Sequence, residues 1–283
     1  MTDNIRRAMQ DIDLAMQAEA QPLVNKFGLT ETSDSPLGKG LPWVLYHGLH
    51  KDLRIYVVCP GKDAASGMFL LMPLLIASEF GIYKRNALFI RFATTNQDLS
   101  TGIDSVGTVP ASLITFASIQ ALQPDILINA GTCGAFKVKG ANIGDVFLVS
   151  DVVFHDRRIP IPMFDLYGVG LRQAFSTPNL LKELNLKIGR LSTGDSLDMS
   201  TQDESLIIAN DATLKDMEGA AVAYVAELLK VPVIFLKAVT DLIDGDKPAA
   251  EEFLQNLAVV TSALEETATK VINFIHGKTL SDL

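Results

Sequence analysis

The pattern of apolar and polar positions along the 283-residue chain predicts strands that alternate with helices. Residues 231–239 form an almost unbroken apolar run, typical of a strand covered on both faces in a parallel sheet. Further strands are predicted at residues 43–47, 53–59, 125–129, 145–151 and 187–192. Helical spacing of apolar residues is found at residues 105–122 and 250–274. This alternation predicts a three-layer α/β/α sandwich whose ligand site lies at the strand ends.

The stretch 211–246 reads as a helix, a tight turn, a buried strand and an acidic loop. Thr213 and Asp216 fit a loose capping box, which predicts that the helix begins there, with Glu218 in its first turn. Asp241 follows the predicted strand at the edge where open α/β sheets bind ligands. Two carboxylates in one crevice indicate acid/base or sugar-hydroxyl chemistry. The alternative is structural, with Glu218 favouring the helix dipole and Asp241 capping a turn.

Composition indicates an ordinary globular, soluble protein, with 48% hydrophobic and 20% charged residues. The net charge of 24 − 33 = −9 argues against nucleic acid or an anionic membrane as a partner. Two cysteines, Cys59 and Cys133, are too few for a disulfide framework or a zinc site, which favours a reducing, cytoplasmic compartment. The charged segment 1–17 lacks the apolar core of a signal peptide, and the apolar run 68–76 is too short to span a bilayer.

Six segments, in this order, resemble the methylthioadenosine nucleosidases, most closely their plant branch, within the purine nucleoside phosphorylase superfamily. They are AMQAEA (15–20), INAGTCGAF (128–136), FHDRR (154–158), STGDS (192–196), DMEGAAVA (216–223) and AVTDLIDGDKP (238–248). The resemblance covers residues 14–66 and 102–283. It implies one phosphorylase/hydrolase-like domain over residues 1–283 with a mixed central sheet. It also implies a cytoplasmic homodimer that needs neither metal nor cofactor.

The reaction that the resemblance implies is hydrolysis of the N-glycosidic bond of 5′-methylthioadenosine, which gives adenine and 5-methylthioribose in methionine salvage. In this family the purine leaves as its N7 gains a proton, the sugar becomes oxocarbenium-like, and water adds. By position in the motifs, Asp241 would be the general acid on N7. Glu19 would orient and deprotonate the water. The sequence leaves open whether S-adenosylhomocysteine is also a substrate.

The same resemblance implies a set of substrate-binding residues. They are Met16, Thr132, Leu197, Lys215, Met217 and Glu218. Glu218 would hold the ribose hydroxyls, with Met217 against the sugar, and Leu197 would wall the adenine. Met16 and the loop 159–164 would form the apolar pocket for the 5′-alkylthio group, with the loop acting across the dimer interface.

Two alternatives are weighed against this interpretation. The phosphorylases of the superfamily have a Gly and an Arg in the first strand–helix loop, where this chain has MQAEA, and an Arg where it has Asn129. Phosphate needs a cationic cradle, and a carboxylate such as Glu19 would repel it, so both differences favour water as nucleophile. The alternative from another class is a catalytically impaired nucleoside-binding protein. Cys133 is expected to be an inert buried cysteine, and His155 a solvated loop histidine.

The chain departs from the family pattern at two places. Where the family has a strongly apolar first strand, this chain has RRAMQDIDL, with Asp11 and Asp13 inside it. About 35 residues, 67–101, then intervene between two segments that the family joins almost directly. This atypical insertion has the form of an altered splice product or an imperfect gene model, or else of a genuine lid or partner-binding element. The fold is expected to be complete without residues 68–101.

Overall fold

The computed structural model describes residues 21–32, 36–37, 43–51, 53–60, 74–75, 87–91, 96–97 and 104–283. The helices are α2 (Thr108–Leu122), α3 (Phe164–Val169), α4 (Pro178–Leu184), α5 (Thr201–Ala209), α6 (Gly219–Leu228) and α7 (Ala249–Ile275). Short 3₁₀ helices lie at Lys137–Lys139 and Leu280–Asp282, and residues 21–26 are helical. No helix within these ranges is both long enough and apolar enough to cross a membrane.

Among the described residues, eleven strands form one mixed sheet. The sheet contains β1 (Thr30–Glu31), β2 (Trp43–His50), β3 (Leu53–Pro60), β4 (Leu74–Leu75), β5 (Ala87–Arg91), β8 (Ile126–Ala135), β9 (Val146–Phe154), β10 (Arg172–Gln173), β11 (Lys187–Thr193), β12 (Leu214–Asp216) and β13 (Val233–Leu242). Two further strands, β6 (Asn96–Gln97) and β7 (Asp104–Ser105), pair with each other. The predicted hairpin at 43–59 and the predicted central strands are confirmed.

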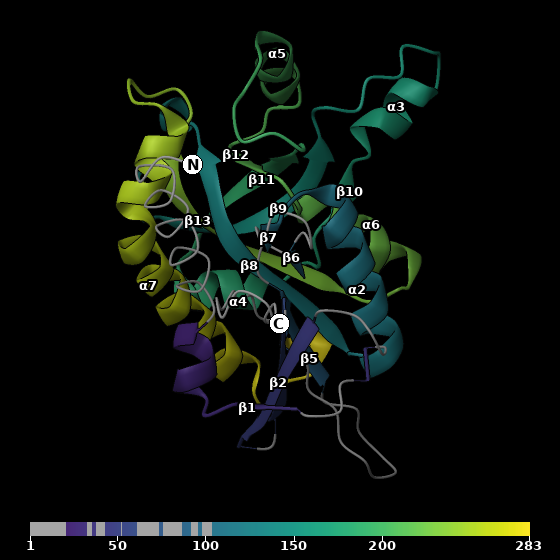
Figure 1. The fold of residues 1–283 in the computed structure, drawn as a ribbon, viewed down its shortest axis with the longest axis vertical. Helices are drawn as coiled ribbons and strands as arrows, with labels where there is room; N and C mark the ends of the chain where they lie inside the picture. Colours follow the sequence, from purple (N-terminus) through teal and green to yellow (C-terminus); the bar gives the residue numbers. More distant parts are fainter. Residues whose placement is uncertain are drawn as a thin grey trace.

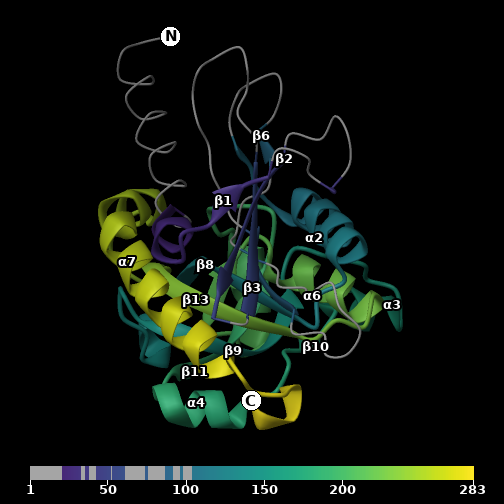
Figure 2. The same cartoon turned by 90° about the horizontal axis from the view of Figure 1, so that it is seen from below.

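Helices cover both faces of the sheet, which confirms the predicted three layers. Helix α7 lies along β13 and β8 on one side, and α2 and α6 lie on the other (Figures 1 and 2). Alternate residues of β13 enter the two cores. Ile234, Leu236 and Ala238 pack in the core with α7, whereas Val233, Phe235 and Val239 pack in the core with α2 and α6. The run at 231–239 is therefore apolar at almost every position, with Lys237 as the exception, because both faces of this strand are buried.

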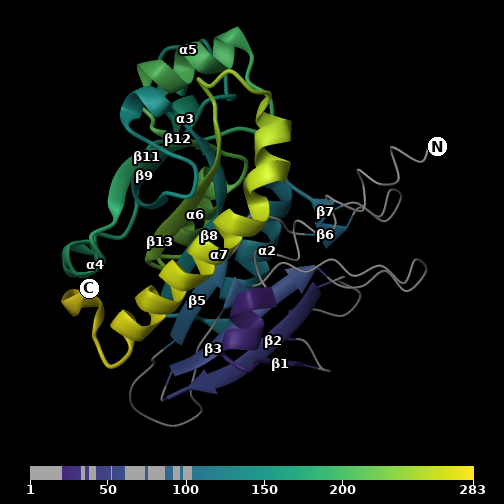
Figure 3. The same cartoon turned by 90° about the vertical axis from the view of Figure 1, so that its left-hand side faces the viewer.

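Residues 87–91, within the segment 67–101 that the sequence pattern suggests is an insertion, form a strand of the main sheet. β5 runs parallel to β3, with Arg54 opposite Ala87, and parallel to β8, with Arg91 opposite Asn129. Figure 3 shows β5 beside β3, at the part of the sheet that continues into β2 and β1. The expectation that the fold is complete without residues 68–101 does not agree with this pairing, because β3 connects to β8 through β5. The altered segment with Asp11 and Asp13 lies outside the described residues.

The helix predicted to begin at Thr213 begins six residues later. Leu214–Asp216 instead forms β12, which pairs with β11 on one side and with β8 on the other. The side chain of Asp216, two residues before the N-cap Glu218, then accepts a hydrogen bond of 2.8 Å from the backbone N–H of Gly219, the first residue of α6. Tertiary pairing of buried Leu214 overrides the local capping signal here.

Candidate active site

The carboxyl ends of β8 and β13 and the short strand β12 meet at Gly134. In the sheet register, Gly134 lies opposite Asp241 on one side and opposite Lys215 on the other. A Cβ atom at residue 134 would lie 2.8 Å from Asp241 Oδ2 and 2.9 Å from Ile243 Cγ1. Only glycine leaves room for this carboxylate, so the small-residue loop of the sequence has a role in placing Asp241.

Asp241 is a buried carboxyl with a raised pKa. The residue is 5% exposed, and burial raises its pKa, while a hydrogen bond from the Thr240 hydroxyl (2.8 Å to Oδ1) and the charge of Lys215 lower it. A raised pKa favours the protonated form of a carboxyl, which is the form that can donate a proton. This environment suits a general acid better than that of an exposed aspartate.

Helix α7 fixes the end of the strand that carries Asp241. The backbone N–H of Leu242 donates to Glu252 Oε2 at 2.9 Å, and Asn256 Nδ2 donates to the carbonyl oxygen of Thr240 at 3.0 Å. Both partners lie in the first turns of α7. The position of Asp241 is therefore set by main-chain contacts on either side of it, and its own side chain is not needed for them.

Glu218 lies at the N-cap position of α6, one residue before the helix, and is 3% exposed. Its Oε1 accepts a hydrogen bond of 2.9 Å from the backbone N–H of Gly107, which immediately precedes α2. The predicted position in the first helical turn is thus off by one residue. Met217, half-buried, follows directly from β12, so the two residues project from the connection between β12 and α6.

Lys215 connects β12 to the loop that follows β11. Its Nζ donates to the carbonyl oxygens of Ser196 at 2.7 Å and Leu197 at 3.0 Å. Burial lowers the pKa of Lys215, while the nearby carboxylates of Asp241 and Asp216 raise it. The lysine thus holds the backbone beside Leu197, whose own side chain is half exposed.

A buried ionic network that the sequence pattern does not predict links β12 to β13. Lys237 on β13 and Asp216 on β12 form an ion pair with Nζ 2.9 Å from Oδ2. Asp216 also accepts a hydrogen bond from the Thr193 hydroxyl at 2.6 Å, and that hydroxyl accepts one from Ala220 N at 2.9 Å. The sequence signal for it is the single lysine inside an apolar strand. A buried charge requires a partner, so this lysine indicates an ion pair in the core.

His155 is buried, which corrects the expectation of a solvated histidine. It is 2% exposed, and its Nδ1 lies 3.0 Å from the Ser192 hydroxyl oxygen. Burial and the charge of Lys215 lower its pKa. The ring also lies against Gly194, where a Cβ atom would collide with it. Cys133 is free and buried, as expected, and burial raises the pKa of its thiol.

The structure brings most of the expected site residues to one edge of the sheet. Those on the strand ends and their connections are Thr132, Lys215, Met217, Glu218 and Asp241. Leu197 joins them through the backbone contact with Lys215. Glu19 and Met16 lie outside the described residues. Within the residues that the structure describes, no three His, Cys, Asp or Glu side chains are grouped so as to hold a metal ion.

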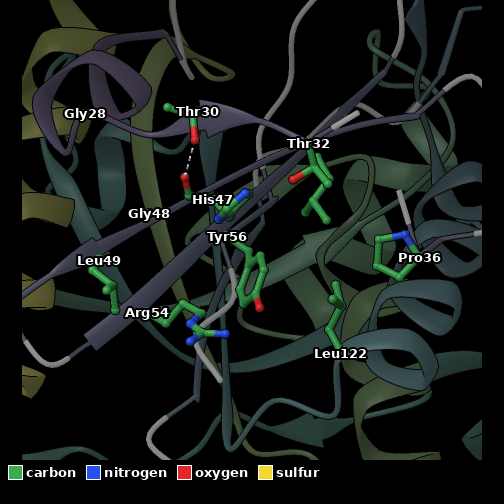
Figure 4. A pocket seen from close by; sticks show the side chains of 11 residues that line it. Gly28, Thr30, Thr32, Pro36, His47, Gly48, Leu49, Arg54, Tyr56 and Leu122 are labelled. Carbon is green, nitrogen blue, oxygen red and sulfur yellow. Dashed lines mark hydrogen bonds between the residues drawn. The ribbon is translucent and has the colours of Figure 1, made fainter. Parts of the chain in front are cut away.

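A separate cavity of about 620 Å³ contains none of the expected site residues. It lies on β1–β3, where the rings of His47 and Tyr56 are 5.8 Å apart (Figure 4). Arg54, which lines it, is near the start of β3, whereas the candidate site lies at the carboxyl ends of the strands. The cavity is therefore distinct from the cluster around Asp241.

Comparisons with known proteins point to one family. The family model described as the phosphorylase superfamily matches residues 12–273. The 5′-methylthioadenosine nucleosidase of Arabidopsis thaliana is 78% identical over 270 residues, covering 95% of this chain and 88% of that protein. A 5′-methylthioadenosine/S-adenosylhomocysteine nucleosidase of the same plant is 56% identical over 270 residues, covering 95% of this chain and 92% of that protein.

Solved structures give the same result. The structure of the Arabidopsis thaliana 5′-methylthioadenosine nucleosidase in apo form superimposes with a TM-score of 0.80 at 79% identity. The match covers 95% of this chain and 96% of that one. This chain and that relative therefore share the same fold, a mixed sheet flanked by helices.

Proposed function

Because the chain belongs to the phosphorylase superfamily, we propose that it hydrolyses the N-glycosidic bond of 5′-methylthioadenosine to adenine and 5-methylthioribose. The observation that carries this proposal is the buried Asp241 carboxyl, with its raised pKa, at the sheet edge that also holds Glu218. High identity along nearly the whole chain to a nucleosidase of that specificity supports the choice of substrate. Its place in metabolism is then the salvage of methionine from this by-product.

In the proposed mechanism, Asp241 donates a proton to N7 of the adenine, which is a poor leaving group until it is protonated. Glu218 accepts hydrogen bonds from the ribose hydroxyls, and these bonds strengthen as the sugar becomes cationic. Met217 packs against the sugar, and Thr132 lines the same end of the site. Leu197 walls the adenine, on a backbone segment that Lys215 holds in place.

The proposed nucleophile is water, which Glu19 orients and deprotonates, and Met16 lines the pocket for the 5′-methylthio group. A phosphorylase would instead need a cationic cradle for phosphate. The buried Lys237 does not offer one, since its charge is paired with Asp216. Asn129, at the position where the phosphorylases carry an arginine, is fully buried on β8.

We also propose that the chain forms a homodimer through the outer face of α2. Val109, Leu113 and Phe116 recur at spacings of four and three residues, and they are between 49% and 68% exposed. A second apolar group lies around α3: Ile161, Met163, Phe164, Leu166 and Tyr167. Exposed apolar residues at helical spacing are typical of a surface that another subunit covers. The loop 159–164 would then reach the partner's 5′-alkylthio pocket.

The dimer is tested by replacing the middle of this stripe. Leu113→Asp should give a monomer in sedimentation experiments, because a carboxylate would be buried in the interface. Val259→Asp is the control, since Val259 is also exposed on a helix, in α7, which covers the other face of the sheet. Equal masses for both variants would contradict the α2 interface.

The proposed compartment is the cytoplasm, supported by the free, buried thiol of Cys133.

Turnover of 5′-methylthioadenosine tests the function directly. We expect adenine and free 5-methylthioribose to be released at the same rate with and without inorganic phosphate. Asp241→Asn should lower kcat by about 10² or more, since asparagine keeps the shape but cannot donate the proton. A phosphate requirement with a sugar 1-phosphate as product would instead establish a phosphorylase. S-adenosylhomocysteine is the second substrate to assay, because the relative at 56% identity is named for both.

A further inference from the structure

The first turn of α2 is held by carboxylates from two distant loops. Gly107, which precedes the helix, provides no side-chain cap. Its N–H donates to Glu218 Oε1 at 2.9 Å, and the N–H of Thr108 donates to Asp195 Oδ1 at 2.5 Å. The Thr108 hydroxyl donates to Asp195 Oδ2 at 2.6 Å. Backbone N–H groups at a helix start lack intrahelical partners, and here two carboxylates supply them.

The backbone at Gly107 is adapted to this arrangement. Its φ of 102° lies in the region that favours glycine, and a Cβ atom there would collide with the Asp195 carboxylate. The two hydrogen-bonded contacts are therefore made by adjacent residues at close quarters. A shift of Thr108 relative to Asp195 would therefore also move the neighbouring Gly107 N–H, which donates its hydrogen bond to Glu218.

Asp195 is itself fixed in the loop that follows β11. Its backbone N–H donates to Asp156 Oδ2 at 2.7 Å. The next residue, Ser196, is one of the two whose carbonyl oxygens bind Lys215. Asp195 thus connects the segment proposed to wall the adenine with the helix start that contacts Glu218.

We propose that Asp195 is a positioning residue for ribose recognition. By fixing Thr108, it keeps the Gly107 N–H directed at Glu218 Oε1 and so fixes the orientation of that carboxylate. One N–H uses one of about four acceptor sites on a carboxylate, so the bond orients Glu218 without excluding contact with ribose hydroxyls. This inference rests on the proposed function of Glu218 as the ribose ligand.

The test compares turnover of 5′-methylthioadenosine and its 2′-deoxy analogue in Asp195→Asn and Thr108→Val. Both variants remove part of the contact between Asp195 and Thr108, and the second leaves every carboxylate in place. We expect the ratio of kcat/KM for the two substrates to fall about tenfold from its wild-type value, because a displaced Glu218 no longer distinguishes the hydroxyl. Thr108→Ser, which keeps both donors, should retain the wild-type ratio.

Asp282→Asn is the matched control for a lost cap. Asp282 accepts hydrogen bonds from the N–H and the hydroxyl of Thr279 at 2.8 and 2.6 Å, the same pattern at the far end of the chain. Its substrate ratio should not change. An unchanged ratio in both Asp195→Asn and Thr108→Val, with strong discrimination in the wild type, would overturn the positioning role alone. A wild-type ratio near one would overturn the ribose role of Glu218, and the inference with it.

Discussion

Lys237 and Asp216 form an ion pair at 2.9 Å in which the side chains are 0% and 1% exposed. The pair joins β13, which carries Asp241, to β12, which leads into Met217 and Glu218. Two proposed functional elements are thus connected by one buried electrostatic contact. Burying two charges is costly, and the loss of one partner leaves the other uncompensated.

We therefore predict that Lys237→Met destabilises the protein by about 3–5 kcal/mol. The Asp216 carboxylate would stay buried with only its hydrogen bonds from Thr193 and Gly219. Denaturant unfolding would measure the change. Lys270→Met is the control, because Lys270 pairs with Glu266 on the exposed surface of α7 and should leave the midpoint unchanged. A Lys237→Met loss below about 1 kcal/mol would contradict the prediction.

The buried Asp241 predicts a pH-dependent cost in stability. Its pKa is raised in the folded chain, so the folded state binds more protons than the unfolded state between the two pKa values. As pH rises through that interval, from the ordinary aspartate pKa of about 3.9 upward, the free energy of unfolding falls. Asp241→Asn lacks this term. Its melting temperature should exceed that of the wild type by more at pH 8 than at pH 4, and a constant difference would argue against the raised pKa.

Glu218→Gln should lose rate and also lose discrimination against the 2′-deoxy substrate. The charge-assisted bond to the ribose hydroxyl is weakened in the variant. Removal of that hydroxyl from the substrate should therefore lower kcat/KM less in the variant than in the wild type. Measured values of kcat/KM for both substrates give the comparison. Equal losses on the deoxy substrate in the wild type and in Glu218→Gln would remove Glu218 from the ribose.

Glu19→Gln should lose hydrolysis, since the amide cannot take a proton from the water. The proposed roles of the two glutamates differ, so this variant should keep the wild-type preference for the 2′-hydroxyl in whatever turnover remains. Single-turnover measurements with excess enzyme would provide the data. Retention of a near-normal kcat would exclude Glu19 as the base.

Deletion of residues 68–101 tests the place of β5 in the sheet. β3 pairs with β2 and β5, and β5 in turn pairs with β8, so the deletion removes the strand between β3 and β8. We expect the shortened chain to lose soluble expression or to unfold at a lower denaturant concentration. A deletion of equal solubility and activity would show that the sheet closes without β5, as the sequence pattern alone suggests.

The apolar pattern was sufficient for the layers and for most strands. Strands such as β13 and the long helix α7 have strong periodicity over many residues, and tertiary context only moved their ends. β12 was missed because three residues carry too little pattern, and a local capping signal pointed elsewhere. β5 was missed because its assignment depends on pairing with two strands that are distant in sequence.

For the candidate site too, some features could be predicted from the sequence and others could not. Asp241 and Glu218 could be proposed from their places after a strand and at a helix start, and the resemblance supplied their roles. The hydrogen bonds that hold these residues in place could not be predicted. Gly107 and Glu218 are 111 residues apart, and Thr108 and Asp195 are 87 apart, so no local spacing relates them. The burial of His155 likewise depends on β11, which contributes Ser192.

Helix α2 carries the exposed Leu113, and the residue directly before it, Gly107, donates a hydrogen bond to Glu218. If a second subunit covers the outward face, the dimer contact and the contact that orients the ribose ligand Glu218 belong to the same helical segment. The specific activity of the enzyme should then depend on its own concentration. A concentrated stock diluted far below the dissociation constant would lose activity over time, and one brought back to high concentration would show a lag before reaching its full rate.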